Sequence, residues 1–149
     1  MRILILSFLL LIFGSARSQT ARDSIKATVN DLFTAMKTSD PAKLAATFDS
    51  SAVLQTISRN AAGETVVLGE KVADFAASVG KLAAGDADER VEFDRIMIDG
   101  PMATVWAPYK FYYKGKFSHC GVDMFQLVRV SSGWKIVYLI DTRRKDACL

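Results

Sequence analysis

The segment that decides the fold is ATVWAPYKFYYKGKFSHCGVDMFQLVRVSSGWKIVYLIDTRRK, which spans residues 103–145. It holds three long runs rich in β-branched and aromatic residues, separated by Lys114-Gly115 and by Ser132-Gly133. Short glycine-containing turns between such runs are a strong signal for β-hairpins. We therefore predict three consecutive antiparallel strands over residues 103–113, 116–130 and 134–145. Strands of this length can bend into a half-barrel, whose hollow must be filled by helices or by a ligand.

The residues before this segment predict three helices and several shorter strands. Apolar residues at helical spacing indicate a first helix near residues 25–36 and a third over residues 72–79. Asp40 and Pro41 are typical of the N-cap and first turn of a short second helix that reaches Phe48. Strands are expected at residues 52–58, 65–68 and 91–98, with a polar loop at residues 85–88. Helices first and strands last indicate an α+β fold, a cone-shaped curved antiparallel sheet packed over three N-terminal helices.

The first eighteen residues have the features of an export signal. Arg2 precedes an apolar run over residues 3–13, and small residues follow, ending in Ala16-Arg17-Ser18. The run is too short for a membrane-spanning helix, and the small-x-small ending is typical of a cleavage site. We expect residues 1–18 to be a signal peptide and residues 19–149 to form a single domain. The mature protein is then expected to be secreted or periplasmic.

The charge of the mature chain argues against nucleic acid as a partner. The full chain carries 19 Lys and Arg against 16 Asp and Glu, and the loss of Arg2 and Arg17 with the leader lowers the net charge from +3 to +1. A nearly neutral domain does not attract phosphate backbones strongly. We expect no nucleic-acid partner, and no membrane association after cleavage.

Cys120 and Cys148 are the two cysteines of the chain. In an oxidising compartment a disulfide between them is the default expectation. The predicted strand register places Cys120 opposite Lys145, so the tail would have to curl back to form the bridge, which the sequence alone leaves open. Two cysteines and one histidine offer no metal-site spacing, and no glycine-rich phosphate loop is present, so we expect neither a metal nor a cofactor.

Several short phrases of the chain resemble those of a known family. LFTAM at residues 32–36, followed by Asp40, resembles the opening helix pair of the nuclear transport factor 2-like superfamily. HCGVDMFQL at residues 119–127, with GWKI at 133–136 and TRR at 142–144, is similar to its lumazine-binding-like and SnoaL-like groups. The resemblance implies a cone of curved sheet over helices, with a pocket inside. Because the superfamily spans enzymes, ligand binders and dimerisation modules, the function must be argued from the site.

Counting back from the two turns predicts which side chains share a sheet face. In this register Asp123 faces Trp106 on one neighbouring strand and Thr142 on the other. One face collects Trp106, Lys110, Tyr112, His119, Asp123, Phe125, Tyr138 and Thr142, and the opposite face collects Val105, Tyr109, Met124, Val128, Leu139, Asp141 and Arg143. Both faces are apolar enough to need cover, so we expect helices on one and a second copy of the chain, in a homodimer, on the other. A β-bulge would exchange these assignments beyond it.

The first of these faces is the predicted pocket. Its proposed ligand-binding residues are Trp106, Tyr112, Asp123, Tyr138 and Thr142. The candidate catalytic residues are Asp123 as general base and His119 as proton shuttle. A cross-strand hydrogen bond from Asp123 to Thr142 is the simpler interpretation of this residue. Asp141 and Arg143 form a competing site on the other face, where a salt bridge is the simpler interpretation.

These patterns lead to one leading function and two alternatives. We expect an exported protein that holds a small apolar or aromatic molecule in the cone cavity. The first alternative is an acid/base enzyme, isomerase- or cyclase-like, acting on a polyketide- or steroid-like substrate. The second is a homodimeric interaction module whose cavity is filled by its own side chains. A single histidine excludes a two-histidine dehydratase site, and Asp141-x-Arg143 reverses the Arg-x-Asp phrase of the epoxide hydrolase type.

Overall fold

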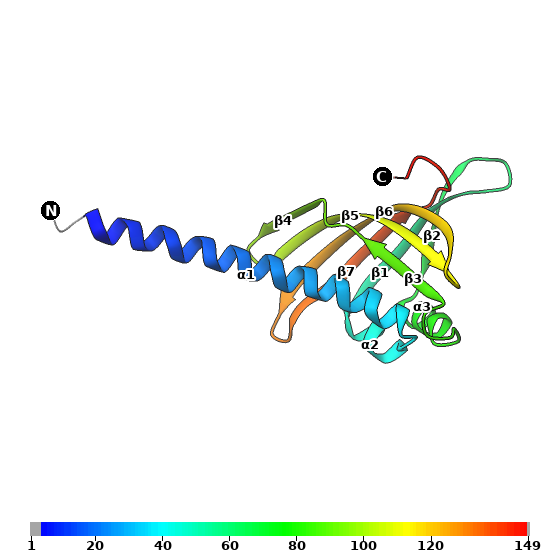
Figure 1. Cartoon of the computed structure of the whole chain (residues 1–149), viewed down its shortest axis with the longest axis horizontal. Coiled ribbons are helices and arrows are strands. Elements are labelled where there is room, and N and C mark those ends of the chain that lie inside the picture. The colour runs from blue at the N-terminus through cyan, green and yellow to red at the C-terminus, as the bar shows by residue number, and fades with distance from the viewer. Residues whose placement is uncertain (1–3, 149) are drawn as a thin grey trace.

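The structure, a computed structural model of the chain, describes the backbone of residues 4–148 and the side chains of residues 19–148. Its elements are α1 (Leu4–Lys37), α2 (Pro41–Ala46), β1 (Phe48–Arg59), β2 (Thr65–Glu70), α3 (Val72–Val79), β3 (Ala87–Val91), β4 (Arg95–Asp99), β5 (Met102–Tyr113), β6 (Lys116–Val130) and β7 (Gly133–Thr142). Helices come first and strands last, so the α+β prediction is confirmed (Figure 1). The predicted signal peptide covers residues 1–18, whose side chains lie outside the described residues.

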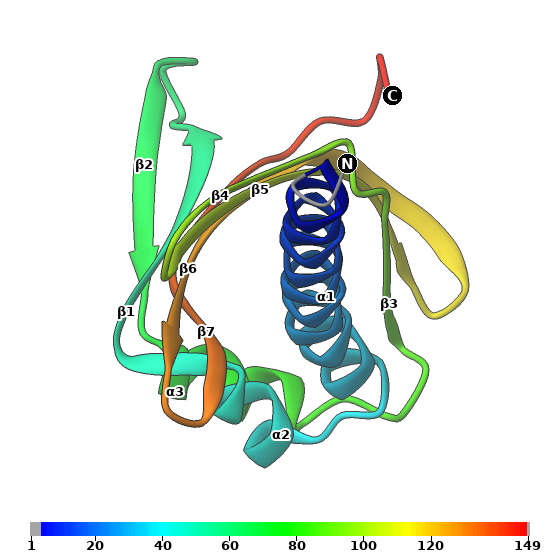
Figure 2. The same cartoon turned by 90° about the vertical axis from the view of Figure 1, so that its left-hand side faces the viewer.

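The strands form one curved sheet that wraps around α1 (Figure 2). The strand order is β2-β1-β7-β6-β5-β3, and β4 also pairs with β5. The prediction of a wholly antiparallel sheet is wrong at one pair, because β1 and β7 run parallel. The chain leaves β1 and returns to β7 only after α3 and five other strands, and such a long crossover lets two neighbouring strands point the same way.

The predicted first helix is confirmed and supplies the buried filling of the cone. Ile25, Val29 and Leu32 are almost completely buried, and the ring of Phe33 lies edge-on to Phe125 of β6, with 6.1 Å between centroids. The apolar face of α1 therefore packs against the concave side of the sheet. Within the described residues, no helix is long and apolar enough to cross a membrane.

The second helix begins as predicted but ends earlier. The Asp40 carboxylate accepts a hydrogen bond from the Lys43 N–H at 3.0 Å, and Pro41 occupies the first turn. Phe48 was predicted on this helix, but it is the first residue of β1 and is buried. α2 ends at Ala46, where Thr47 caps it and the chain turns into the sheet.

The strand predicted at residues 91–98 is instead the end of β3 and most of β4. The first part of β3 occupies the polar loop expected at residues 85–88. Both strands pair with β5, and the break between them lies opposite Pro108. Proline has no N–H to donate, so the hydrogen-bond ladder is interrupted there.

The β5–β6 hairpin has the predicted turn but not the predicted register beyond it. Lys114 and Gly115 have φ of 52° and 75°, as a tight hairpin turn requires. Tyr112 pairs with Phe117 as expected, but Phe111 pairs with His119 and leaves Ser118 as an extra residue. This bulge shifts every later pair by one residue.

The β6–β7 register is also shifted by one residue. Val130 pairs with Gly133, so the turn lies one residue earlier than predicted. A second irregularity, at Val137, then leaves Asp123 beside Asp141 instead of Thr142. Because neighbouring side chains point to opposite faces, a shift of one residue moves a side chain to the other face of the sheet.

Candidate functional site

A cavity of about 180 Å³ lies between the concave face of the sheet and helices α1 and α3. Apolar side chains line one part of it: Leu32, Phe33, Met36, Phe75, Phe111 and Leu139. Polar and charged side chains from four strands and from Arg143, just after β7, line the rest; the strand residues are Glu89, Tyr109, His119, Asp123 and Asp141. An apolar cavity with a few converging polar groups is the usual form of a small-molecule site.

A larger hollow of about 1240 Å³ runs along α1 beside the β6–β7 hairpin. It is open to solvent, and the α1 side of its lining consists mainly of alanine, serine and threonine side chains. The smaller cavity is the better candidate site, because it brings buried ionisable groups together and the larger groove does not.

The carboxyl groups of Glu89 and Asp123 form an acid pair at the polar end of the cavity. Asp123 is 3% exposed, and no donor among residues 19–148 reaches its Oδ2. The carboxyl of Glu89 lines the same part of the cavity and lies close enough to Asp123 to raise its pKa. Two carboxyl groups can form a hydrogen bond only when one of them is protonated, so the pair is built to share a proton.

Burial raises the pKa of both carboxyl groups. Burial raises the pKa of Glu89 to about 7, with a hydrogen bond from Asp123 acting against the shift. Burial, and then the charge of Glu89, raises the pKa of Asp123 well above its ordinary value. The pair therefore holds a proton near neutral pH, which an isolated surface carboxylate does not do.

Asp141 is the third carboxylate at the cavity, and its hydrogen-bonding capacity is used by neighbouring groups. Arg143 donates to its Oδ2 at 2.8 Å, and Thr56 donates to its Oδ1 at 2.6 Å. The Tyr109 hydroxyl lies 3.3 Å from Oδ2 and 3.0 Å from the backbone oxygen of Thr142. Burial raises the pKa of Tyr109, so its hydroxyl stays protonated and acts as a donor. Asp141 and Arg143 thus form a neutral pair.

His119 is held against two aromatic rings at the cavity. Its ring lies 5.0 Å from Phe111 and edge-on to Tyr109 at 5.7 Å, measured between centroids. Its Nδ1 is 3.1 Å from the hydroxyl of Ser118, the extra residue of the bulge. Burial lowers the pKa of His119, so the ring is neutral at neutral pH.

The structure brings only two of the predicted pocket residues to the cavity, namely Asp123 and His119. The ring of Tyr112 lies under the guanidinium of Arg90, 4.3 Å away. Tyr138 donates to Gln55 at 2.5 Å, Thr142 accepts from the Val122 N–H at 3.2 Å, and Trp106 is 47% exposed. The predicted register was wrong by one residue for Trp106, Tyr138 and Thr142, which therefore do not line the cavity. Tyr112 keeps its predicted partner, but the bulge at Ser118 separates it from the face that Asp123 occupies.

The same shift brings in residues that were predicted on the opposite face. Tyr109, Leu139, Asp141 and Arg143 line the cavity together with Asp123. Asp141 and Arg143, which were predicted to form a competing site, therefore belong to the same site as Asp123 and His119.

Glu89 was not predicted as a site residue. It lies in β3, a strand of five residues, between the polar loop predicted at residues 85–88 and the strand predicted from residue 91. The alternation of Ala87, Glu89 and Val91 is the signal that could have revealed it, because alternate residues of a strand face the same side. Its position beside the cavity depends on the pairing of Glu89 with Phe111 of β5.

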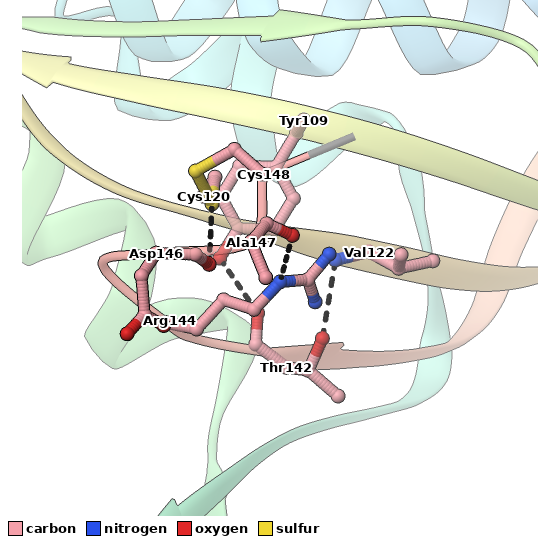
Figure 3. The surroundings of a disulfide bond; sticks show 8 residues. All are labelled: Tyr109, Cys120, Val122, Thr142, Arg144, Asp146, Ala147 and Cys148. Carbon is pink, nitrogen blue, oxygen red and sulfur yellow. Dashed lines mark hydrogen bonds between the residues drawn. A yellow bond between two sulfur atoms is a disulfide. The ribbon is translucent and has the colours of Figure 1, made fainter.

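A disulfide between Cys120 and Cys148 fastens the C-terminal tail to β6 (Figure 3). The tail curls back as the bridge requires, and Cys120 and Arg144 exchange two backbone hydrogen bonds of 2.8 and 2.9 Å. The guanidinium of Arg144 donates to the Ala147 oxygen at 3.0 Å. Within the described part of the chain, no cluster of three or more potential metal-binding side chains occurs.

With the fold and the site described, the family of the chain follows from comparison with known proteins. The family model described as "Putative lumazine-binding" matches residues 20–139, so the chain belongs to this family. No curated protein sequence matches it.

Solved structures of the nuclear transport factor 2-like (NTF2-like) class share the fold. An NTF2-like protein of unknown function from Silicibacter pomeroyi DSS-3 is 18% identical, with 85% of this chain and 98% of that chain covered and a TM-score of 0.67. An NTF2-like protein with a cystatin-like fold from Novosphingobium aromaticivorans is 13% identical, with 89% and 87% covered and a TM-score of 0.68. The superfamily suggested by the sequence is confirmed.

Replacing Glu89 by glutamine is expected to stabilise the protein at pH 8 but not at pH 4.5. In the unfolded chain Glu89 loses its proton near pH 4.5, and in the folded protein it does so near pH 7. Between these values the folded state binds more protons, so wild-type stability falls as the pH rises. Glutamine removes this penalty, and the gain at pH 8 should be about 1–3 kcal/mol in urea unfolding. Glu92→Gln, at an exposed position just after β3, is the control and should show little change at either pH.

Proposed function

We propose that the protein binds a small, mainly apolar or aromatic molecule in the cavity beneath α1. The observation that carries this proposal is the cavity itself, in which aromatic walls from α1, α3 and β5 meet buried polar groups of Tyr109, Asp123 and Asp141. Aromatic and aliphatic walls provide the binding energy of such a site, and a few polar groups fix the orientation of the ligand.

The volume limits the size of the ligand. The cavity measures about 180 Å³, below the roughly 300–1,000 Å³ of pockets for drug-sized molecules. An apolar cavity of about 150 Å³ is known to hold benzene. The volume therefore favours a single substituted ring over the steroid- or polyketide-sized substrates considered from the sequence. Because the protein's own side chains leave this cavity open, it also weighs against the alternative of an interaction module filled by them.

Filling the cavity tests this proposal. Toluene is expected to raise the melting temperature of the wild-type protein, because a ligand that binds only the folded state stabilises it. Phe75→Trp, on α3 at the cavity wall, should abolish the shift. Phe93→Trp is the matched control, since Phe93 is also half-buried but does not line the cavity. If toluene raises the melting temperature of both variants equally, it binds outside the cavity.

A second candidate function is acid/base catalysis with Asp123 as the general base, and the acid pair is the observation that favours it. A carboxyl with a raised pKa beside a neutral imidazole is suited to moving protons near neutral pH. Cyclohexanone is a single-ring probe of suitable size, and its α-protons should exchange with D2O faster in the presence of the protein. Asp123→Asn should reduce this rate by roughly 10²–10⁴-fold. If the wild type does not accelerate the exchange, the catalytic function is contradicted and binding remains as the proposed function.

We also propose that the protein is exported and begins at Gln19 when mature. The apolar run with its small-residue ending supports this, as does the family match, which begins at residue 20. A disulfide is common in oxidising compartments and rare in the cytosol. N-terminal sequencing of protein from the native host should start at or within a few residues of Gln19, and retained Met1 would contradict export.

The convex face of the sheet supports a homodimer. Met97, Met102 and Trp106 are 47–57% exposed there, and Val53 is 46% exposed on the same side of β1. An apolar surface of this kind is commonly covered by a second copy related by a two-fold axis. Sedimentation should give twice the monomer mass, and Trp106→Asp should reduce it to the monomer. A wild-type monomer at micromolar concentration would exclude this assembly.

A further inference from the structure

At the polar end of the cavity, Arg143 and Tyr109 direct their hydrogen bonds to Asp141 and its neighbours. Arg143 donates to Asp141 through Nε at 2.8 Å and reaches the Thr56 hydroxyl at 3.3 Å. The Tyr109 hydroxyl is used by Asp141 and the Thr142 oxygen. Asp123 Oδ2, by contrast, is buried and receives no hydrogen bond from residues 19–148. The polar end of the cavity therefore holds a buried acceptor that no donor of the described residues satisfies.

The charge around the cavity has the same bias. The groups facing it are Glu89 from β3, Tyr109 from β5, His119 and Asp123 from β6, Asp141 from β7, and Arg143 just after β7. The helices add only apolar side chains to the lining. Asp141 and Arg143 neutralise each other, His119 is neutral, and Tyr109 keeps its proton. The acid pair is left without a cation.

Resting on the proposed function, we infer that the ligand is a single-ring molecule bearing a cationic N–H donor, such as an amidine or amine, which binds the carboxyls of Glu89 and Asp123. The ring lies against the apolar walls, and the cationic group supplies the hydrogen bonds that the acid pair lacks. A buried polar group without a partner is costly, so a ligand that satisfies it gains more than one that only fills space.

The cation replaces the proton that the acid pair holds. In the free protein the two carboxyls share a proton near neutral pH, and a bound amidinium makes their ionised form the favoured one. Binding therefore releases a proton to solvent. Since the ligand competes with this proton, affinity for a cation should rise between pH 6 and pH 8, the range around the Glu89 pKa of about 7.

Three ring compounds of nearly equal shape test the inference: benzamidine is a cation, benzamide is neutral and benzoate is an anion. Calorimetry at pH 8 should give a benzamidine affinity roughly ten- to a hundredfold above that of benzamide, with benzoate weakest. Titrations in two buffers of different ionisation enthalpy should show proton release on benzamidine binding at pH 6.5.

Variants separate the acid pair from general charge effects. Asp123→Asn with Glu89→Gln should abolish the preference for benzamidine and the proton release. Asp94→Asn, on the exposed segment between β3 and β4, removes a carboxylate outside the cavity and should leave both unchanged. Circular dichroism checks that the double variant is folded. If the double variant is unfolded, the single variant Glu89→Gln is used in its place.

The outcomes distinguish this inference from the proposed function. Benzamide or benzoate binding as tightly as benzamidine would overturn the cationic ligand and leave the cavity as a binding site. A benzamidine preference that survives in the folded variant would also overturn it. If toluene and all three compounds fail to bind, the proposed function falls together with the inference.

Discussion

Replacement of Gly121 by alanine is expected to cost at least about 3 kcal/mol of unfolding free energy. A Cβ at this position would lie 1.8 Å from the backbone oxygen of Thr142 and 2.7 Å from the ring of Tyr109. The first obstacle is backbone, so β6 and β7 would have to separate. Such a movement would break the Tyr109 hydrogen bonds to Thr142 and Asp141, which shape the polar end of the cavity.

The Gly121 experiment needs a control for the general effect of replacing glycine in a strand. Gly69→Ala in β2 serves, because the nearest atom to its added Cβ is the Leu54 oxygen at 3.9 Å, an ordinary contact. Urea unfolding should show a large loss for Gly121→Ala and a change within about 1 kcal/mol for Gly69→Ala. Similar values for the two variants would show that β7 does not approach β6 as closely as the structure indicates.

Removal of the disulfide is expected to destabilise the protein by about 3–4 kcal/mol. Cys120 and Cys148 are 28 residues apart in sequence, and a cross-link closing a loop of this length restricts the unfolded chain by roughly that free energy. This is a large share of the about 5–15 kcal/mol that stabilises a typical domain. The double variant Cys120→Ala/Cys148→Ala should therefore unfold at a much lower urea concentration than the wild type.

Chemical reduction provides the matched test of the disulfide. Treatment of the wild type with a thiol reductant should lower its midpoint to nearly that of the double variant, and the same treatment should leave the double variant unchanged. A midpoint of the reduced wild type equal to that of the oxidised protein would mean that the bridge adds no stability. In that case the hydrogen bonds between Cys120 and Arg144 would suffice to hold the tail.

The two predictions concern the same part of the molecule. Gly121 follows Cys120 in β6, and both hold the end of β7 and the start of the tail. Arg143, which neutralises Asp141 at the cavity, lies in this segment. The stability of the tail and the geometry of the site are therefore linked.

The sequence by itself determined the elements that depend on neighbouring residues. The helical spacing of Ile25, Val29 and Leu32 predicted the buried face of α1, because residues three and four apart share a helix face. Lys114-Gly115 predicted its hairpin, because that turn requires positive φ angles that glycine adopts readily. The resemblance of short phrases indicated the superfamily, and Asp123 and His119 were rightly expected to share a sheet face.

The tertiary structure decided which other side chains join them. The extra residues at Ser118 and Val137 are not marked by any local pattern, since a bulge depends on how both strands pack against their partners. Each shift moved later side chains to the other face, which took Trp106 out of the cavity and brought Tyr109 in. Glu89 meets Asp123 only because β3 pairs with β5, and β5 with β6. The acid pair is formed by residues 34 positions apart, so strand pairing and not local sequence creates it.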